Sequence, residues 1–222
     1  MFTKDTNKWK QDRKRILDES VGAVVVWDFD GVIADTEPLH EESYRLMLKR
    51  VGYKPTRDFY PPYTGKTDEF MWHAFKDLGV KLDNDVQGFA KEKSDTLKQV
   101  IKDKVSLKPT WLVKDLYLPL SDIAKRQVIL SNGDIEIIIS LLKRWGLITY
   151  LEVIQKPNEN RKKELLLDFL SEGKTVIFED NAETLKLASS LGAFTIGVEH
   201  PMFSKVPLKA DVIVPINKPR RY

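Results

Sequence analysis

Short apolar runs recur along the chain and are separated by stretches with helical periodicity. The first run, from Val24 to Trp27, has no polar alternation, which is typical of a strand buried on both faces of a parallel sheet. Further runs of this kind occupy residues 127–131, 151–154, 175–180, 194–198 and 211–214. Helical patterns between them cover residues 135–145, 162–170 and 182–191. This alternation predicts an α/β fold with a doubly wound parallel sheet.

The pattern changes after the first predicted strand, because residues 37–105 contain helical patterns and no convincing strand. Helices are predicted over residues 38–52, 68–78 and 83–101. The loop at 57–67 is rich in proline and glycine and is predicted to lack regular structure. We therefore predict an α-helical cap domain at 37–105, inserted into a core domain made of residues 21–36 and 106–222.

Residues 1–20 are predicted to form a helical extension of the core. A helix over 3–20 places Trp9 and Ile16 on one side, where they can dock on the sheet domain. The segment is charged throughout and lacks the apolar centre of a signal peptide. No stretch of the chain approaches the roughly 18 apolar residues that cross a bilayer. We expect a cytoplasmic protein with no membrane partner.

The composition of the chain argues against several classes of function. The formal net charge of the 222 residues is only +3, which gives no support to a nucleic-acid partner. The chain has no cysteine, which excludes disulfides, a thiol nucleophile and cysteine-based zinc sites. Its 3 histidines, His40, His73 and His200, are too scattered in sequence to indicate a histidine-rich metal site.

Acidic and polar side chains follow three of the predicted strands. Asp28 and Asp30 come after the first, and we expect them to point to the same side of an extended chain. The stretch "LSNGD" with Ser131 follows the second, and "FEDN" with Glu179 and Asp180 follows another. Because strand ends of an open parallel sheet converge on one crevice, these groups are predicted to form one site.

The predicted site combines oxygen ligands with an anion-binding turn. Several carboxylates at one sheet edge suit a hard cation such as Mg²⁺. The hydroxyl of Ser131 and a backbone freed by Gly133 can donate to an anion at the start of a helix. A cation site next to an anion-binding turn indicates that the bound anion is a phosphate. Lysines at 156, 162 and 163 are available to neutralise the phosphate from its other side.

The stretch "DFDGVIADTE" at 28–37 resembles the first motif of the haloacid dehalogenase-like (HAD) superfamily. In the same order, "LSNG" resembles the second motif, "KP" at 156–157 the third and "FEDN" the fourth. The resemblance covers nearly the whole chain after residue 22. It implies a Rossmann-like core with an α-helical C1 cap, as in the subgroup of β-phosphoglucomutase and many sugar-phosphate phosphatases.

The resemblance also implies roles for individual residues. Asp28 would be the nucleophile that forms an aspartyl-phosphate, and Asp30 the general acid and base. Mg²⁺ would be held by Asp28, the carbonyl of Asp30 and Asp180, with Glu179 as a further candidate ligand. The phosphate would be bound by Ser131, the backbone of Asn132, and Lys156. Asp35 and Thr36 belong to the first motif and would hold the loop geometry. In the cap, the substrate would contact His40, Gly65, Lys66, Thr67 and Lys93.

The sequence departs from the family pattern before the third motif, where the loop is short and Gln155 replaces a common glycine. This leaves Lys163 as an alternative to Lys156. The activity implied is that of a Mg²⁺-dependent phosphatase acting on a small phosphate ester, as a monomer or small homo-oligomer. Two alternatives stay open, a phosphomutase of the β-phosphoglucomutase type and a non-catalytic phosphate binder. Dehalogenase activity is disfavoured because that branch lacks the acid supplied here by Asp30.

Overall fold

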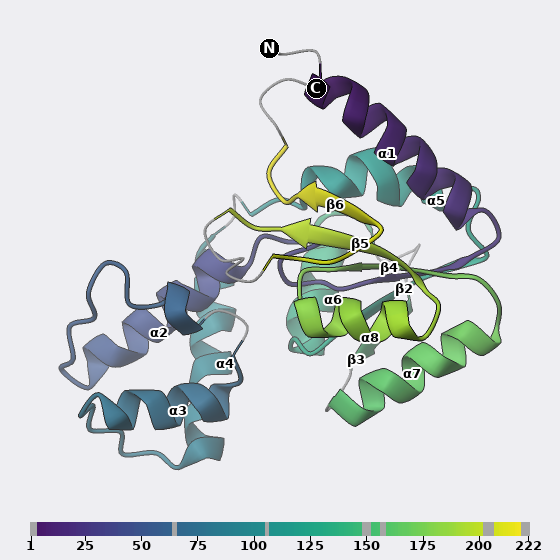
Figure 1. The fold of residues 1–222 in the computed structure, drawn as a ribbon. Helices are drawn as coiled ribbons and strands as arrows, with labels where there is room; N and C mark the ends of the chain where they lie inside the picture. The colour runs from purple at the N-terminus through teal and green to yellow at the C-terminus, as the bar shows by residue number, and fades with distance from the viewer. Residues whose placement is uncertain are drawn as a thin grey trace. The chain divides into compact units, whose positions relative to one another are not determined.

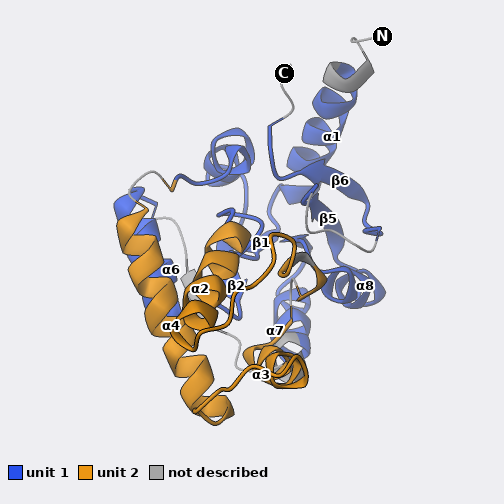
Figure 2. Ribbon diagram, turned by 90° about the vertical axis from the view of Figure 1, so that its left-hand side faces the viewer, with its two compact units in different colours: residues 1–35, 108–222 blue, residues 36–107 orange. Residues whose placement is uncertain are grey.

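The structure is a computed structural model that describes residues 4–63, 66–104, 107–147, 152–155, 159–201 and 207–218. The chain divides into two compact units, which Figure 2 draws in different colours. The sheet unit contains residues 1–35 and 108–222, and the helical unit contains residues 36–107. The helical unit thus interrupts the sheet unit directly after Asp35, and each unit is described below by itself.

The sheet unit is built on six parallel strands in the order β3-β2-β1-β4-β5-β6 (Figure 1). The strands are β1 (Val24–Trp27), β2 (Arg126–Ser131), β3 (Glu152–Gln155), β4 (Thr175–Glu179), β5 (Phe194–Glu199) and β6 (Val212–Pro215). Each neighbouring pair runs in the same direction. The order reverses at β1, so the predicted doubly wound parallel sheet is confirmed.

The centre of the sheet determines where the three chemistry-bearing loops begin. Trp27, the last residue of β1, pairs with Ile129 of β2 and Phe178 of β4. The Asp28 N–H then donates to the Phe178 carbonyl oxygen over 2.9 Å, which extends the ladder by one bond. The loops that follow β1, β2 and β4 therefore leave the sheet side by side at the same edge.

One face of the sheet is covered by α7 (Glu159–Ser171) and α8 (Ala182–Ser190), which lie together in front of the strands in Figure 1. Leu166 and Phe169 of α7 are buried in one apolar cluster with Val24 and Val26 of β1. Burial of these side chains on both helices and strands is the main favourable term that holds the layers together.

Side chains from β1 and β2 bind a helical segment that the sequence analysis missed. A π-helical turn, Val113–Tyr117, continues into the short α5, Leu118–Leu120. The Trp27 indole N–H donates to Gln127 Oε1 over 2.9 Å, and Gln127 Nε2 donates to the Tyr117 carbonyl over 3.1 Å. These buried contacts stabilise the segment in the folded protein. Its sequence contains a proline and shows no clear helical pattern, and its hydrogen bonding is irregular. The helix α6, Ile135–Arg144, follows β2.

The predicted N-terminal helix is α1, Lys4–Ser20. Trp9 and Ile16 are buried, at 6% and 0% exposure, which confirms that this side of the helix docks on the sheet unit. The Trp9 ring meets Trp111 edge-on at 4.8 Å between ring centroids. Arg15 donates to the Asp211 carbonyl oxygen over 2.9 Å, which ties α1 to the residue just before β6.

The helical unit consists of α2 (Glu37–Arg50), α3 (Asp68–Asp77) and α4 (Val86–Asp103). Its interior is aromatic, since the Tyr44 ring lies 5.8 Å from Phe75 and 6.1 Å from Phe89 between centroids. The loop predicted to lack regular structure contains one short 3₁₀ turn at Pro61–Tyr63, so that prediction was wrong at this point. Proline fixes the backbone angle that such a turn needs.

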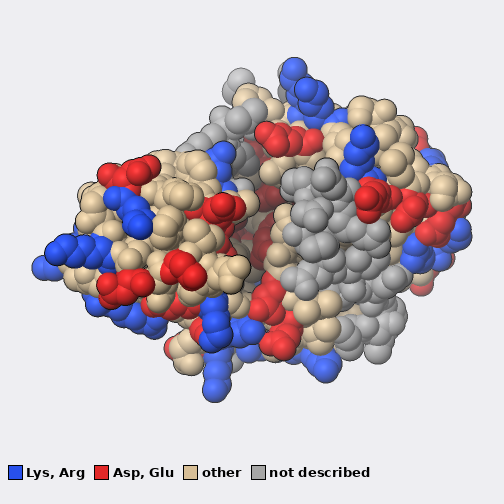
Figure 3. Space-filling model, turned by 90° about the horizontal axis from the view of Figure 1, so that it is seen from below, with Lys and Arg blue, Asp and Glu red and all other residues tan. Residues whose placement is uncertain are grey.

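No helix in the part of the chain that the structure describes is long and apolar enough to span a bilayer. Basic and acidic side chains are interspersed over the described residues on the face drawn in Figure 3. This mixture agrees with the small net charge of the sequence.

Candidate active site

Three carboxylates gather at the carboxyl edge of the sheet. Oxygen atoms of Asp28, Glu179 and Asp180 lie within 4.8 Å of one another. Asp28 is the first residue after β1, Glu179 is the last residue of β4, and these two strands are neighbours. Glu179 is buried, at 2% exposure, whereas Asp28 and Asp180 are partly exposed. The parallel register of β1 and β4 is therefore what brings the acids together.

The donor set fits a hard divalent cation. Two oxygens bound to one Mg²⁺ at roughly 2.0–2.1 Å are about 3 Å apart when adjacent and about 4.2 Å apart when opposite, so the three carboxylates are near enough to close on one ion. At about 4 Å, each like-charge pair costs roughly 1 kcal/mol in water and about 4 kcal/mol at an effective dielectric constant near 20. A cation reverses the sign of that cost.

The loop after β1 passes directly against Asp180. Gly31 has a φ of +73°, and a Cβ added there would lie 2.2 Å from Asp180 Oδ2. Glycine is required at this position both by the left-handed backbone and by the space. The close approach explains the glycine of the "DFDG" stretch and fixes the loop that carries Asp30 beside the acid cluster.

Asp30 lies next to the loop after β2. A Cβ added to Gly133 would lie 2.8 Å from Asp30 Oδ2 and 3.3 Å from Ser131 Oγ. Ser131 is 1% exposed and its hydroxyl oxygen accepts the Gly133 N–H over 3.0 Å. The structure thus brings together residues from the carboxyl ends of three strands that are far apart in the sequence, namely Asp28, Asp30, Ser131, Glu179 and Asp180.

The reason given from sequence for pairing Asp28 with Asp30 was wrong. The strand β1 ends at Trp27, and Asp30 lies in a turn where it forms an isolated bridge with Ala34. Alternation along an extended chain therefore does not orient these two side chains. Asp30 lies instead in a tight loop that backbone hydrogen bonds close between Phe29 and Ala34.

The turn after β2 leads into α6, which begins with a side-chain cap. Asp134 Oδ1 accepts the backbone N–H of Glu136 over 2.9 Å and that of Ile137 over 3.4 Å. These donors of the first helical turn are therefore already bonded. Asn132 is exposed between Ser131 and this cap. The phosphate contacts expected on this loop, the Ser131 hydroxyl and the Asn132 backbone, therefore precede the helix cap.

Two predicted site residues, Lys156 and Gly65, lie outside the described residues. The alternative lysine, Lys163, is exposed on α7. Thr67 is the N-cap of α3, and its hydroxyl oxygen accepts the Phe70 N–H over 3.2 Å. The exposed Lys66 places its ammonium 5.4 Å from the centroid of the Phe70 ring. Both residues therefore contact α3 itself.

His40 and Lys93 meet inside the helical unit. Lys93 Nζ lies 2.8 Å from His40 Nδ1, and because an ammonium only donates, Nδ1 is the acceptor. The same ammonium lies 3.8 Å from Asp68 Oδ1, which also accepts the Tyr44 hydroxyl over 2.5 Å. Lys93 is only 12% exposed, so its charge is matched by Asp68 within this unit.

Tyr44 and Asp68 were not singled out from the sequence. Burial, followed by the negative charge of Asp68 and the hydrogen bond to it, raises the pKa of Tyr44 far above its ordinary value. The phenol therefore stays protonated and continues to donate to Asp68. A tyrosine and an aspartate 24 residues apart give no local signal of this contact.

A second contact missed from sequence joins His200 to Asp35. His200 follows β5 directly, is 5% exposed, and places Nε2 3.4 Å from Asp35 Oδ1. The available signal was the position of His200 at the end of a predicted strand, at the edge of the sheet where the acids gather.

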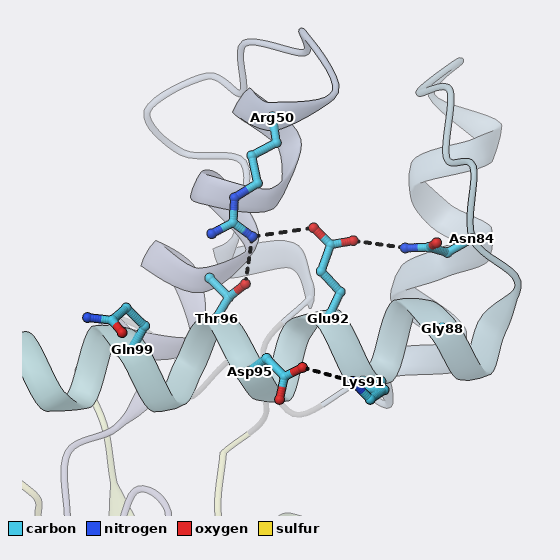
Figure 4. A pocket seen from close by; sticks show the side chains of 8 residues that line it. All are labelled: Arg50, Asn84, Gly88, Lys91, Glu92, Asp95, Thr96 and Gln99. Carbon is cyan, nitrogen blue, oxygen red and sulfur yellow. Dashed lines mark hydrogen bonds and ion pairs between the residues drawn. The ribbon is translucent and has the colours of Figure 1, made fainter.

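The helical unit also has a groove of about 440 Å³ beside α4, shown in Figure 4. Arg50 there donates to Thr96 over 2.9 Å and pairs with Glu92 at 3.4 Å. Lys91 pairs with Asp95 at 3.2 Å. Because these charges neutralise one another, the groove offers no clear site for an anion.

Comparison with known proteins identifies relatives that match most of the chain. The sequence profile described as haloacid dehalogenase-like hydrolase matches residues 25–198. A phosphorylated carbohydrates phosphatase from Thermotoga maritima is 28% identical over 189 residues, which cover 80% of this chain and 86% of that protein.

Solved structures share the fold. CbbY from Rhodobacter sphaeroides in complex with phosphate superposes with a TM-score of 0.70 at 16% identity, covering 87% of this chain and 93% of that chain. β-Phosphoglucomutase from Clostridium difficile superposes with a TM-score of 0.62 at 20% identity, covering 87% and 90%. These likenesses agree with the α/β architecture predicted from the sequence.

Proposed function

Because the chain belongs to the haloacid dehalogenase-like hydrolase family, we propose that it is a Mg²⁺-dependent phosphatase of a small phosphorylated metabolite. The observation that carries the proposal is the cluster of Asp28, Glu179 and Asp180 next to the loop of Asp30 and Ser131. The phosphatase activity named for the Thermotoga maritima relative supports the reaction and the class of substrate.

The acid cluster is proposed to hold the cation. Asp28, Asp180, Glu179 and the main-chain carbonyl of Asp30 are the ligands in this proposal, and Mg²⁺ is the ion that their oxygen atoms suit. When bound, the ion supplies the positive charge that lets a carboxylate approach a phosphate dianion.

Two aspartates are proposed to carry the reaction. An oxygen of Asp28 attacks the phosphorus, the bond from phosphorus to the ester oxygen breaks, and Asp30 gives its proton to that leaving oxygen. Asp30, now a carboxylate, takes a proton from a water molecule. The water oxygen attacks the phosphorus, and the bond to Asp28 breaks. The products are an alcohol, inorganic phosphate and the original Asp28 carboxylate.

The transferred phosphate is proposed to be bound by Ser131, the backbone N–H of Asn132, and Lys156. The buried Ser131 hydroxyl oxygen accepts the Gly133 N–H, which orients it, and Gly133 itself lies against Asp30. A lysine ammonium would balance the negative charge that remains on the phosphate oxygens. Lys163 stays the alternative to Lys156.

The helical unit is proposed to select the substrate through His40, Gly65, Lys66, Thr67 and Lys93. A phosphomutase is the alternative function, and it would have to bind a second phosphate. The match of the Lys93 charge by Asp68 at 3.8 Å favours hydrolysis, because the pair leaves little net positive charge for that second phosphate.

A screen of phosphate esters tests the proposal. With Mg²⁺, the purified protein should release inorganic phosphate from at least one sugar phosphate or related metabolite, and EDTA should stop the release. Conversion of a hexose 1-phosphate to its 6-phosphate, dependent on a bisphosphate, would establish the mutase instead. If the protein binds an ester but turns over no member of the panel, it is a non-catalytic phosphate binder.

Substitution of the nucleophile tests the assignment of Asp28. Asp28→Asn should lower kcat by about 10³-fold or more while the melting temperature stays close to that of the wild type. Asp122→Asn, at an exposed aspartate of the same unit, is the matched control and should be fully active. Full activity in Asp28→Asn would contradict the proposed mechanism.

The two candidate lysines can be separated in the same way. Lys156→Ala should lower kcat/KM by about 10²-fold or more, as expected for loss of a charge that stabilises the transition state. Lys163→Ala removes an exposed lysine of α7 and should have little effect. The reverse result would transfer the role to Lys163.

A further inference from the structure

The loop that carries Asp30 ends at a buried contact that the roles proposed above do not use. Asp35 Oδ1 is buried and makes no hydrogen bond with any residue that the structure describes. His200 Nε2 lies 3.4 Å from this oxygen, and the His200 side chain is only 6% exposed. The imidazole thus places a polar nitrogen within reach of the buried carboxylate oxygen.

The loop between Asp30 and Asp35 is closed by backbone bonds. The Gly31 N–H donates to the Ala34 carbonyl over 2.8 Å, and the Ala34 N–H donates to the Phe29 carbonyl over 3.0 Å. Ala34 also forms isolated bridges with Asp30 and with Pro109. A displacement of Asp35 therefore moves Ala34, and through it the peptide that joins Asp30 to Gly31.

Thr110 holds the middle of the same loop. Its N–H donates to the Ile33 carbonyl over 2.8 Å, and its hydroxyl donates to the Val32 carbonyl over 2.7 Å. These bonds fix residues 32 and 33, and Ala34 is held by its bridges with Asp30 and Pro109. At the end of the loop, where the chain passes from the sheet unit to the helical unit, the contact is the one between Asp35 and His200.

We propose that His200 is a positioning residue for the general acid and base Asp30, and that it acts through Asp35 and the loop of residues 31–35. This inference rests on the proposed function, in which Asp30 protonates the leaving oxygen. The His200 imidazole at the end of β5 packs against Asp35 at 3.4 Å and restrains it, the closed loop transmits that restraint, and Asp30 is kept in the orientation that proton transfer needs.

The proposal makes a specific kinetic prediction. An aryl ester such as p-nitrophenyl phosphate has a stable phenolate leaving group and needs little help from an acid. A simple alkyl phosphate has a poor leaving group and needs the proton of Asp30. Loss of orientation at Asp30 should therefore slow the alkyl ester much more than the aryl ester, whereas partial unfolding slows both equally.

The experiment compares His200→Ala with His200→Gln, which keeps a side-chain N–H donor of similar reach. His200→Ala should lower kcat for the alkyl phosphate by about 10- to 100-fold and kcat for p-nitrophenyl phosphate by less than about threefold. His200→Gln should recover most of the alkyl activity. Equal loss on the two esters, or full alkyl activity in His200→Ala, would overturn the proposal.

A second variant covers the case in which His200→Ala does not fold. Asp35→Ala removes the buried oxygen together with the partner of His200, and it should give the same split between alkyl and aryl esters. The double variant should be no slower than the slower single variant, because both substitutions break one contact. Additive losses would contradict the coupling.

Hydrogen exchange tests the restraint without any turnover. The Gly31 amide, bonded to Ala34, should exchange faster in His200→Ala than in the wild type, and at the wild-type rate in His200→Gln. His73→Ala, at an exposed histidine of α3, is the control and should leave this amide unchanged. If the wild type hydrolyses neither ester, the proposed function fails. In that case unchanged Gly31 exchange in His200→Ala overturns the positioning role as well, and faster exchange supports it.

Discussion

Gly31 and Asp180 approach so closely that a Cβ on Gly31 would lie 2.2 Å from Asp180 Oδ2. The loop after β1 and the loop after β4 therefore pack in direct contact at the acid cluster. A side chain at residue 31 would have to displace the carboxylate that the proposal assigns to the metal.

Gly31→Ala is predicted to weaken Mg²⁺ binding as well as stability. The left-handed backbone should cost about 1–2 kcal/mol of the free energy of unfolding. Displacement of Asp180 should raise the Mg²⁺ concentration for half-maximal activity by about 10-fold or more. Gly22→Ala is the control, since Gly22 has a φ of +68° with nothing within 4 Å of an added Cβ. Equal Mg²⁺ requirements in the two variants would contradict the role of the close approach.

Mg²⁺ is predicted to stabilise the folded protein through the acid cluster. At a free concentration 100 times the dissociation constant, the ion should raise the free energy of unfolding by about 2.7 kcal/mol. Asp180→Asn should remove most of this gain. Glu183→Gln, at an exposed glutamate on α8, should retain it. Urea unfolding with and without Mg²⁺ measures the difference, and an undiminished gain in Asp180→Asn would place the ion elsewhere.

The raised pKa of Tyr44 predicts a loss of stability at alkaline pH. Above about pH 10 the unfolded tyrosine releases its proton while the folded one keeps it, so the folded state binds the additional proton. The stabilisation is complete below pH 10 and falls by up to about 1.4 kcal/mol per pH unit above it. Tyr44→Phe should have a correspondingly shallower slope of unfolding free energy against pH. If the wild type and Tyr44→Phe have identical slopes of unfolding free energy from pH 10 to 11.5, the Tyr44 phenol ionises in the folded protein at ordinary alkaline pH.

The docking of α1 is predicted to contribute strongly to stability. Ile16 is fully buried, so Ile16→Ala should lower the free energy of unfolding by about 2–5 kcal/mol. Val21, just beyond the helix, is 63% exposed, and Val21→Ala should change the free energy by less than about 0.5 kcal/mol. Denaturant unfolding of the two variants makes the comparison. A loss in Ile16→Ala no larger than that in Val21→Ala would mean that α1 contributes little.

The sequence was sufficient for features that depend on local pattern. Unbroken apolar runs such as Val24 to Trp27 identify strands of a parallel sheet, because both faces of such strands are buried. The helices α2, α6 and α8 were predicted near their observed starts, since their apolar spacing and end signals are contained in neighbouring residues.

Contacts between distant residues were decided only by the tertiary structure. Nothing near Asp68 in the sequence indicates Tyr44 or Lys93, and nothing near Asp35 indicates His200. The helical turn at Val113–Tyr117 likewise depends on Gln127 and the sheet for its order. Amino-acid patterns encode the local preferences of the backbone and which side chains avoid water. Which buried polar groups become partners depends on the distances that packing imposes, and those distances exist only once the chain has folded.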